Sequence, residues 1–495
     1  MNSTFSRLLI ATPDSANVER MLIGLVPKLQ DIVQRFRLGM LTPEKAFGFE
    51  TELEACCREG CRALVEAEYN DIEPAAIEDC PVRMRLNGEE YKRRPKSPNL
   101  IGGLFGPMRL ERFRYEGVEA GVRGIFPLEM HLGIEAGLAT PALAERLGQH
   151  AADHTQQQVL DWLEREHGIK WSAASLRKAT ASLSEGLSAF REASQEKKLL
   201  DLLKKAEESA GPHRPTLSVG RDGIMVPMRH GAYQEASTGT VSVSDRKGKR
   251  LGSVYLGVMP EAGQTTMSDR LTSLLNRVLT QWNGPLRLTY ITDAGHHPRD
   301  YYERVLKTMT DPHRPGRVLE WEWIIDFWHA CCYLSKLREA LFSARPAGWK
   351  WFKRMRHWLR HRQHGITDVL RSATQHRNLL KAISAAREEL YWEGYSYLRK
   401  HARRMAYSRY RRQGKPIGSG VTEAACKTVF TQRLKQSGMR WQVAGGQVVV
   451  DLRVLNLSGV WQDAFRSYLG CRPLTQSAQS GSRMYPTPQK LKIAA

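Results

Sequence analysis

The feature that most constrains this fold is an alternation of strand-like and helical segments in the middle of the chain. After Pro212, the sequence predicts three consecutive strands, then a helix, a fourth strand, a second helix and a fifth strand. The predicted strands span 216–227, 239–244, 253–258, 286–293 and 320–326, and the two helices span 268–282 and 298–308. This order predicts an α/β domain built on a mixed sheet.

Three carboxylates occupy informative places in this pattern. Asp222 falls on the first predicted strand, and Asp293 falls at the carboxyl end of the fourth. Ligands of open α/β sheets gather at the carboxyl ends of strands. Glu423 follows Gly418-Ser-Gly420, whose turn and cap chemistry predicts that a helix begins there.

Each of these acids taken alone is more often a turn or cap residue than a ligand. Together, Asp222, Asp293 and Glu423 would suit Mg²⁺, a hard cation that prefers oxygen ligands, and Mn²⁺ is expected to substitute for it. Two such ions can clamp the attacking and leaving oxygens of a phosphodiester. Lys427 lies one helical turn after Glu423, where it either holds a DNA phosphate or pairs with Glu423.

Other residues compete for the same role. Asp326 ends the fifth predicted strand and could replace one of the three acids. His296, His297 and His329 suggest zinc, but their spacing does not give a closed set of four ligands.

The chain is strongly basic. Its 495 residues include 74 Lys and Arg against 52 Asp and Glu, which gives a formal charge of +22. A surplus of this size favours a polyanionic partner, because neutralising phosphates releases condensed counterions. The alternative is a surface charge that only aids solubility.

Two further properties bear on the cellular location. No segment reaches the roughly 18 to 20 apolar residues needed to span a bilayer, so no membrane association is expected. The eight cysteines form neither paired knuckles nor a dense disulfide framework, so the cytosol is the expected compartment. Three of them, on a predicted helical stretch, are interpreted as core or surface residues, with a metal role left open: Cys56, Cys57 and Cys61.

Residues 344–415 are predicted to form a basic helical insertion. Three tryptophans interleave with Lys and Arg there, and aromatic faces can stack on bases while cations bind phosphates. Buried tryptophans beside solvated arginines would give the same pattern. The candidate DNA-binding residues of this segment are Lys350, Lys353, Arg354, Arg356, Arg403, Arg404, Arg411 and Arg412.

The first 85 residues are predicted to be helical. Apolar residues recur at spacings of three and four between residues 16 and 41, and Pro27 should kink or split that helix. The apolar face either packs on its own domain or forms a dimer seam.

Residues 86–210 are predicted to combine a turn-rich basic stretch at 86–106, a strand or hairpin arm at 107–115, and helices. Three short helices, at 141–150, 154–167 and after Ser172, suit a helix-turn-helix or a small bundle. In the first case, Arg177 and Lys178 would lie on the recognition helix. A separate charged helix at 196–211 is predicted to connect this region to the α/β domain, and residues 471–495 are predicted to be a disordered tail.

Four segments together resemble a known family. They are Val219-Gly-Arg-Asp-Gly-Ile-Met-Val-Pro227, Thr292-Asp-Ala-Gly-His-His-Pro298, Ile325-Asp-Phe-Trp-His-Ala330 and Pro416-Ile-Gly-Ser-Gly-Val-Thr-Glu-Ala-Ala-Cys-Lys427. The last, extended by Gln432-Arg-Leu-Lys-Gln-Ser-Gly-Met-Arg-Trp441, is the most specific. They resemble the ISKra family of bacterial insertion-sequence transposases, part of the wider DDE group, over the chain from about residue 105 to 457.

The resemblance implies a ribonuclease-H-like mixed-sheet core formed by 211–343 and 416–470, with 344–415 inserted between them. It assigns Asp222, Asp293 and Glu423 as a catalytic triad that holds Mg²⁺. The implied activity is cleavage at the ends of a mobile element and transfer of the freed 3′-hydroxyl into target DNA. The implied partners are double-stranded element ends and target DNA, with a homodimer or larger assembly that pairs two ends. A ribonuclease-H-like nuclease without strand transfer and a non-catalytic DNA-binding regulator are the alternatives.

Overall fold

The computed structural model describes residues 16–86, 88–380, 382–471 and 476–477 of this mixed α/β protein. The chain divides into two compact units. One runs from Ser188 to Ala464, and the other combines the residues up to Leu187 with those from Phe465 onward. The predicted tail lies outside the described residues, apart from Cys471 and a short strand at Gln476–Ser477.

A five-stranded sheet forms the centre of the Ser188–Ala464 unit. Its strands are β4 (Thr216–Pro227), β5 (Tyr233–Ser244), β6 (Arg250–Val258), β7 (Arg287–Thr292) and β8 (Trp321–Ile325). They lie in the order β6-β5-β4-β7-β8. The first three pair antiparallel, while β7 runs parallel to β4 and β8 parallel to β7. The predicted succession of strands and helices is confirmed, and β4 and β7 are direct neighbours.

Helices cover both faces of this sheet. Helix α8 (Thr265–Gln281) packs its buried leucines against Val241 and Leu256, on the same face as the second half of α7 (Ala173–Glu208). The opposite face carries α17 (Val443–Ser458), because Gly257 lies directly beneath Val450. Side chains alternate between the two faces of a strand, so this arrangement gives the sheet two separate apolar cores.

A buried carboxylate joins three helices of this unit. Asp451 on α17 accepts hydrogen bonds from Arg191 on α7 (2.6 Å), Arg270 on α8 (3.0 Å) and Gln447 one turn away (2.9 Å). The two guanidinium groups neutralise an acid that would be costly to bury alone. Asp451 therefore fixes the helices on both faces around the edge of the sheet at β6.

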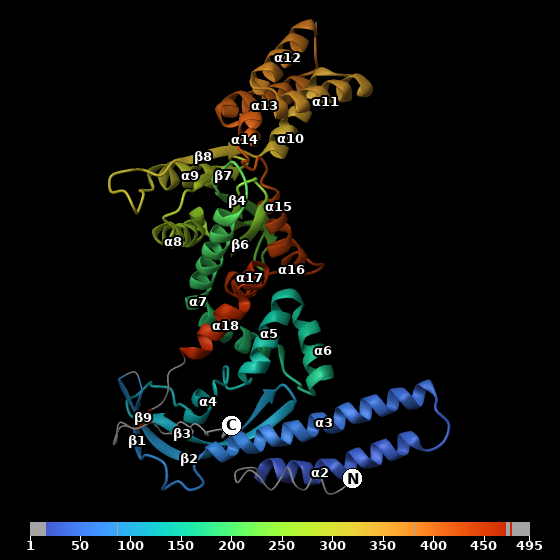
Figure 1. The fold of residues 1–495 in the computed structure, drawn as a ribbon, viewed down its shortest axis with the longest axis vertical. Coiled ribbons are helices and arrows are strands. Elements are labelled where there is room, and N and C mark those ends of the chain that lie inside the picture. Colours follow the sequence, from blue (N-terminus) through green and yellow to red (C-terminus); the bar gives the residue numbers. More distant parts are fainter. Residues whose placement is uncertain (1–15, 87, 381, 472–475, 478–495) are drawn as a thin grey trace. The chain divides into compact units, whose positions relative to one another are not determined.

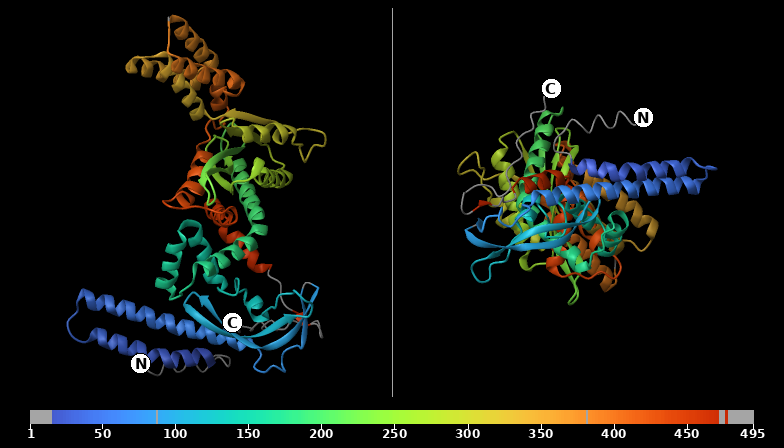
Figure 2. Two further views of the ribbon diagram at one scale, coloured as in Figure 1. Left: turned by 180° about the vertical axis from the view of Figure 1, so that it is seen from behind. Right: turned by 90° about the horizontal axis from the view of Figure 1, so that it is seen from below.

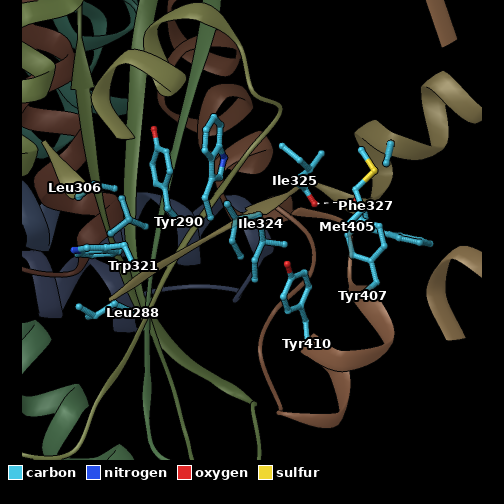
Figure 3. Packing of buried hydrophobic residues seen from close by; sticks show 14 of the residues in the cluster. Leu288, Tyr290, Leu306, Trp321, Ile324, Ile325, Phe327, Met405, Tyr407 and Tyr410 are labelled. Atoms are coloured by element: carbon cyan, nitrogen blue, oxygen red, sulfur yellow. Dashed lines mark hydrogen bonds between the residues drawn. The ribbon is translucent and has the colours of Figure 1, made fainter. Parts of the chain in front are cut away.

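The predicted insertion is helical. After α10 (Phe327–Leu341), the chain forms α11 (Arg345–His361), α12 (Gly365–Leu379), α13 (Ala385–His401) and α14 (Tyr407–Arg412). Figure 1 shows α10 leading from the end of β8 to this group of helices. The group is attached to the sheet by a buried aromatic cluster in which the hydroxyl of Tyr407 donates to the carbonyl of Ile325 (3.0 Å; Figure 3).

The other unit contains a helical hairpin and a second sheet. Helices α2 (Ala16–Arg37) and α3 (Pro43–Ile72) lie side by side (Figures 1 and 2). Strands β1 (Arg83–Leu86), β2 (Glu89–Gly103) and β3 (Gly106–Gly117) pair antiparallel, with β9 (Gln476–Ser477) along β1. They are followed by α4 (Pro127–Leu132), α5 (Pro141–Asp153) and α6 (Gln156–His167), after which α7 begins.

The prediction for 86–106 is wrong, because most of these residues form the 15-residue strand β2 rather than a turn-rich stretch. Their prolines and glycines indicated turns. In the structure, a register shift between Arg93 and Lys96 leaves Pro95 outside the pairing with β3. A bulge accepts proline because no ladder hydrogen bond is needed there.

Two helix predictions are also corrected. Pro27 does not split α2, which runs as one helix from Ala16 and ends at Arg37. The predicted short third helix and the charged helix at 196–211 are one 36-residue helix, α7. Gly186 lies inside α7, where a β-carbon would come within 2.4 Å of Tyr468 Cε2, so the glycine makes room for the packed tyrosine ring.

In the described ranges, no helix combines the length and the apolar composition that crossing a bilayer requires.

Candidate active site

The two aspartates predicted as ligands lie on adjacent parallel strands. Asp222 is on β4, and Asp293 directly follows β7, which pairs with β4 from Thr216↔Arg287 to Gly220↔Ile291. Both side chains are partly exposed. The parallel pairing therefore brings both carboxylates to the same end of the sheet.

Gly220 brings the third carboxylate to this site. Glu423 lies on α15 (Gly420–Ala425), and the neighbouring Thr422 hydrogen-bonds through its hydroxyl to Thr240 of β5 (2.8 Å). A β-carbon on Gly220 would lie 1.9 Å from the Thr422 hydroxyl oxygen. Only glycine permits this approach, which lays α15 directly on β4 and β5.

The helix that carries Glu423 changes its winding immediately after it. Residues Cys426–Thr431 form a π-helix between α15 and α16 (Gln432–Leu434). The wider turn places the Cys426 thiol within 3.5 Å of both Asp222 Oδ2 and the Thr238 hydroxyl, and burial raises the pKa of that thiol to about 12. Cys426 is therefore a neutral donor to Asp222, and π-bulges of this kind are frequent at functional sites.

The charges of the three acids act on one another. Burial raises the pKa of Asp222 to about 6, and the nearby charge of Asp293 adds to that rise. The N–H of Gly223 (2.8 Å) and the Cys426 thiol oppose it, and Glu423 adds a smaller increase. The pKa of Glu423 is itself raised by burial and by Asp326, against a lowering effect of His329. Like charges this close favour the binding of a cation.

The insertion supports the backbone at Asp293. Tyr397 of α13 donates its hydroxyl to the Asp293 carbonyl (2.6 Å), and its ring stacks on Tyr333 of α10 with centroids 3.7 Å apart. The following residue, Ala294, has φ of +65°, and Gly295 N–H donates to Asp293 Oδ1 (2.8 Å). A left-handed alanine is strained, so the surrounding contacts must hold this turn in place.

Asp326, the alternative ligand, has a different role in the structure. It is fully buried; its Oδ1 accepts the N–H of His329 (2.6 Å) and its Oδ2 accepts the N–H of Ser419. The first contact caps α10, and the second ties the end of β8 to the turn that precedes Glu423. With both oxygens engaged by backbone N–H groups, Asp326 positions the Glu423 segment rather than offering a free ligand.

Several carboxylate oxygens remain available for a cation. Within the described part of the chain, neither the Glu423 carboxylate nor Asp293 Oδ2 accepts a hydrogen bond, and Asp222 Oδ2 receives only a thiol. In the same residues, no group of three His, Cys, Asp or Glu side chains lies close enough together to hold a metal ion. His296, His297, His329 and the three cysteines Cys56, Cys57 and Cys61 therefore form no such group either. The acids thus lie near one another without sharing a common point.

The predicted DNA-binding residues belong to both compact units of the chain. Arg177 and Lys178 are exposed on the first turns of α7, and Lys427 is exposed beyond Glu423. Exposed side chains of the insertion are Lys350, Lys353, Arg354, Arg356, Arg403, Arg411 and Arg412. Arg404 is half-buried between the ring of Trp323 (4.0 Å) and Glu303 (3.7 Å), so it also stabilises the fold.

The tryptophans of the insertion are interpreted from the sequence either as surface rings that stack on bases or as buried core residues, and the structure contains both kinds. Trp351 is buried and donates to Ser372 (3.0 Å), as a core residue would. Trp349 is 38% exposed, so its ring is accessible at the surface, and Trp358 is half-buried with Arg362 over its ring (3.8 Å).

Comparison with models of known protein families finds no match to this chain, and a search of curated proteins finds none that matches significantly.

Sequence reasoning missed four contributors: Gly220, Cys426, Tyr397 and the structural role of Asp326. An aspartate between a strand and a helix is a recognisable N-cap signal, so the capping of α10 by Asp326 could have been inferred, but its link to Ser419 could not. The other three act through contacts across more than 100 residues of chain, which no local pattern encodes.

Replacing Gly220 by Ala should lower the free energy of unfolding by about 1–3 kcal/mol, because the new methyl group overlaps the Thr422 hydroxyl and must displace α15. Urea denaturation measures the change. Gly420→Ala is the matched control, since no atom lies within 4 Å of a β-carbon there, and it should change stability by less than about 0.5 kcal/mol. Equal effects of the two substitutions would contradict the close contact.

The raised pKa of Asp222 predicts a pH-dependent stability. Between the unfolded pKa, about 4, and the folded value, about 6, the unfolded chain loses its proton first, so stability falls as pH rises. Asp222→Asn cannot ionise. In EDTA it should be more stable than the parent by about 1–2 kcal/mol at pH 7.5, allowing for partial exposure, and no more stable at pH 4.

Urea denaturation at both pH values tests this, with the exposed Asp463→Asn as control. A constant difference between Asp222→Asn and the parent at the two pH values would show that the Asp222 charge costs the fold nothing.

Proposed function

We propose that this protein is a metal-dependent DNA transposase of the DDE type, with a ribonuclease-H-like core and a resemblance to the ISKra family. The observation that carries the proposal is the gathering of Asp222, Asp293 and Glu423, from segments 71 and 130 residues apart, at one end of the sheet. Three antiparallel strands followed by two parallel ones, with the first strand central, support that core.

The three carboxylates fit a hard divalent cation. The carboxylates have free oxygens that could bind a metal ion, and Mg²⁺ would offset the cost of bringing their negative charges together at a partly buried position. Asp222, Asp293 and Glu423 would hold the ion, and Mn²⁺ would substitute for it. When bound, the metal supplies charge stabilisation to the reacting phosphodiester. Glu423 is exposed on its helix, so its carboxylate is accessible to a cation.

The chain's own residues hold this arrangement. The Cys426 thiol donates a hydrogen bond to Asp222. Tyr397 and Asp326 fix the backbone segments that carry Asp293 and Glu423. In transposition by this scheme, water attacks the phosphodiester at an element end and the 3′-oxygen of the element leaves. The freed 3′-hydroxyl then attacks a target phosphodiester, from which the target's own 3′-oxygen leaves. Both steps are in-line displacements that depend mainly on positioning and charge, so no covalent enzyme intermediate is required.

The proposed substrate is double-stranded DNA, as element ends and as target. The net charge of +22 supplies attraction to phosphates, and Lys427, one turn beyond Glu423, would bind a phosphate beside the reacting bond. The exposed basic residues of α11, of the 3-10 helix Ala402–Arg404 and of α14 would bind DNA backbone, and Arg177 and Lys178 on α7 would do the same.

A homodimer or larger assembly is proposed because two element ends must be joined. The α2–α3 hairpin supports it: among its described residues, Ile32 alone is buried. Ile23 (75% exposed) and Val26 (38% exposed) continue through Leu29 and Val33 as an apolar stripe along α2. Two helices with so small a core gain stability when a second hairpin covers this stripe.

The function is tested by strand transfer in vitro, using DNA that carries the element's own ends. We expect joined products with Mg²⁺ or Mn²⁺, none with EDTA, and a loss of at least about a thousandfold in Glu423→Gln, since a metal ligand is removed. DNA binding should persist in that variant.

Glu389→Gln is the matched control, because Glu389 is exposed on α13 away from the acids. Metal-dependent cleavage without joining would favour the nuclease alternative. Tight binding with neither cleavage nor joining by the parent protein would favour a DNA-binding regulator.

Assembly is tested by sedimentation velocity. The parent protein should sediment as a dimer or larger species, and Val26→Glu should shift it toward monomer because a charge would be buried in the stripe. Leu379→Glu, an equally apolar but distant exposed position, should not. A monomeric parent at micromolar concentration would contradict the α2 interface.

A further inference from the structure

A cavity lies at the opposite end of the sheet from the acids. Its volume is about 580 Å³, and it is lined by the first residues of β7 and β8, the end of α8 and the loop 311–320. β4 begins at Thr216, beside Arg287, and Asp222 lies further along that strand, about 20 Å away at about 3.3 Å per residue. The cavity is therefore separate from the candidate active site.

Several residues that line this cavity carry buried hydrogen-bond donors without acceptors. Among the described residues, the indole nitrogens of Trp282 and Trp321 have no hydrogen-bond partner, and neither do Nε and Nη2 of Arg287. Figure 3 shows the Trp321 ring beside Leu288, with its nitrogen at the end away from the strand. Buried donors are rarely left unpaired, so a ligand rich in acceptor oxygens would complete them.

The charge of the lining favours an anion. Five Arg or Lys side chains face three acids, and those acids are already engaged. Glu322 pairs with Lys415 and Arg409, and Glu320 with Arg317. The remaining acid, Asp311, accepts the N–H of His313 (2.9 Å).

In the described structure, Arg214, Arg287 and Arg314 have no carboxylate within ion-pair distance, although the charge of Glu322 acts on Arg287 from further away. Arg287 donates from Nη1 to the carbonyl of Gln413, which holds its guanidinium in place while two of its donor nitrogens stay unpaired. A fixed guanidinium with free donors suits a phosphate group.

The loop over the cavity is anchored before any ligand binds. A bridge joins Thr310 to Val318, and Asp311 N–H donates to the Arg317 carbonyl (2.8 Å). The His313 ring bonds to the carbonyl of Leu279 at the end of α8 (2.9 Å). The cavity is thus preformed, which lowers the ordering cost of binding.

The remaining walls are apolar and aromatic. Leu279, Leu286 and Leu288 line the cavity together with the rings of Trp282 and Trp321. Such walls accept a planar base, and the volume falls in the range of small-ligand sites. A double helix is too wide to enter.

We propose that this cavity binds a nucleoside phosphate, with its phosphate held by Arg287 and Arg314 and its base against the tryptophans. The nucleotide is either free or an unpaired nucleotide of a DNA strand. The site is independent of the three acids and of the metal, and it goes beyond the proposed transposase activity.

Ultraviolet crosslinking of the full-length protein in EDTA tests the site. The probes are 4-thio-dTMP, and a single-stranded oligonucleotide with one central 4-thiothymidine, with crosslinked peptides mapped by mass spectrometry. We expect crosslinks within 282–288 or 311–322. A crosslink with 4-thio-dTMP alone identifies a free nucleotide, one with the oligonucleotide alone identifies a strand, and both identify the shared chemistry.

Arg287→Gln and Arg314→Gln should each reduce the crosslink yield about tenfold, because each removes charged donors to phosphate. Arg314 is exposed and has no partner to lose, so its variant should fold even if Arg287→Gln does not. Arg304→Gln, an exposed arginine of α9 (His296–Arg304), is the control and should change the yield less than about twofold. Asp222→Asn should leave the crosslink unchanged, which separates this site from the active site.

The proposal is overturned if neither probe crosslinks to these peptides, or if the crosslinks persist in both arginine variants.

Discussion

The contact between α15 and β4 at Gly220 is the constraint on which the site depends. Glu423 lies 130 residues beyond Asp293, and all the helices of the insertion intervene. The helix returns to the sheet only because Gly220 has no side chain where the Thr422 hydroxyl must sit. Thr240 then fixes that hydroxyl by a hydrogen bond, and the π-helix after Glu423 turns Cys426 onto Asp222.

The site is held together against its own electrostatics. The raised pKa of Asp222 shows that gathering acids at a partly buried sheet edge costs free energy, which the surrounding structure must offset. Asp326 and Tyr397 do so by fixing the backbone on either side of the insertion, and Asp451 locks the covering helices through two arginines. Stability is thus concentrated around a locally unfavourable cluster, which is typical of functional sites.

The two ends of the sheet have opposite chemistry. Acids with free oxygens gather where β4 and β7 carry Asp222 and Asp293, and unpaired N–H donors with arginines gather where β7 and β8 begin. One end suits a cation and the other a phosphate. A chain of such net positive charge with both features is consistent with nucleic-acid chemistry in which the strand is bound at more than one place.

The sequence alone determined the local elements of the core. Apolar periodicity predicted all five strands, their succession with the helices, and the placement of Asp222 and Asp293, because period-two patterns depend on neighbouring residues only. It failed where distant contacts override local signals: Pro95 is absorbed by a bulge in β2, and Gly186 lies inside α7 beneath Tyr468. Tertiary structure alone decided that Asp326 is a buried link, that Cys426 contacts Asp222, and that Trp282, Trp321 and Arg287 surround one cavity. Those outcomes depend on which surfaces of the folded chain pack together, and the local sequence around each residue does not encode such long-range contacts.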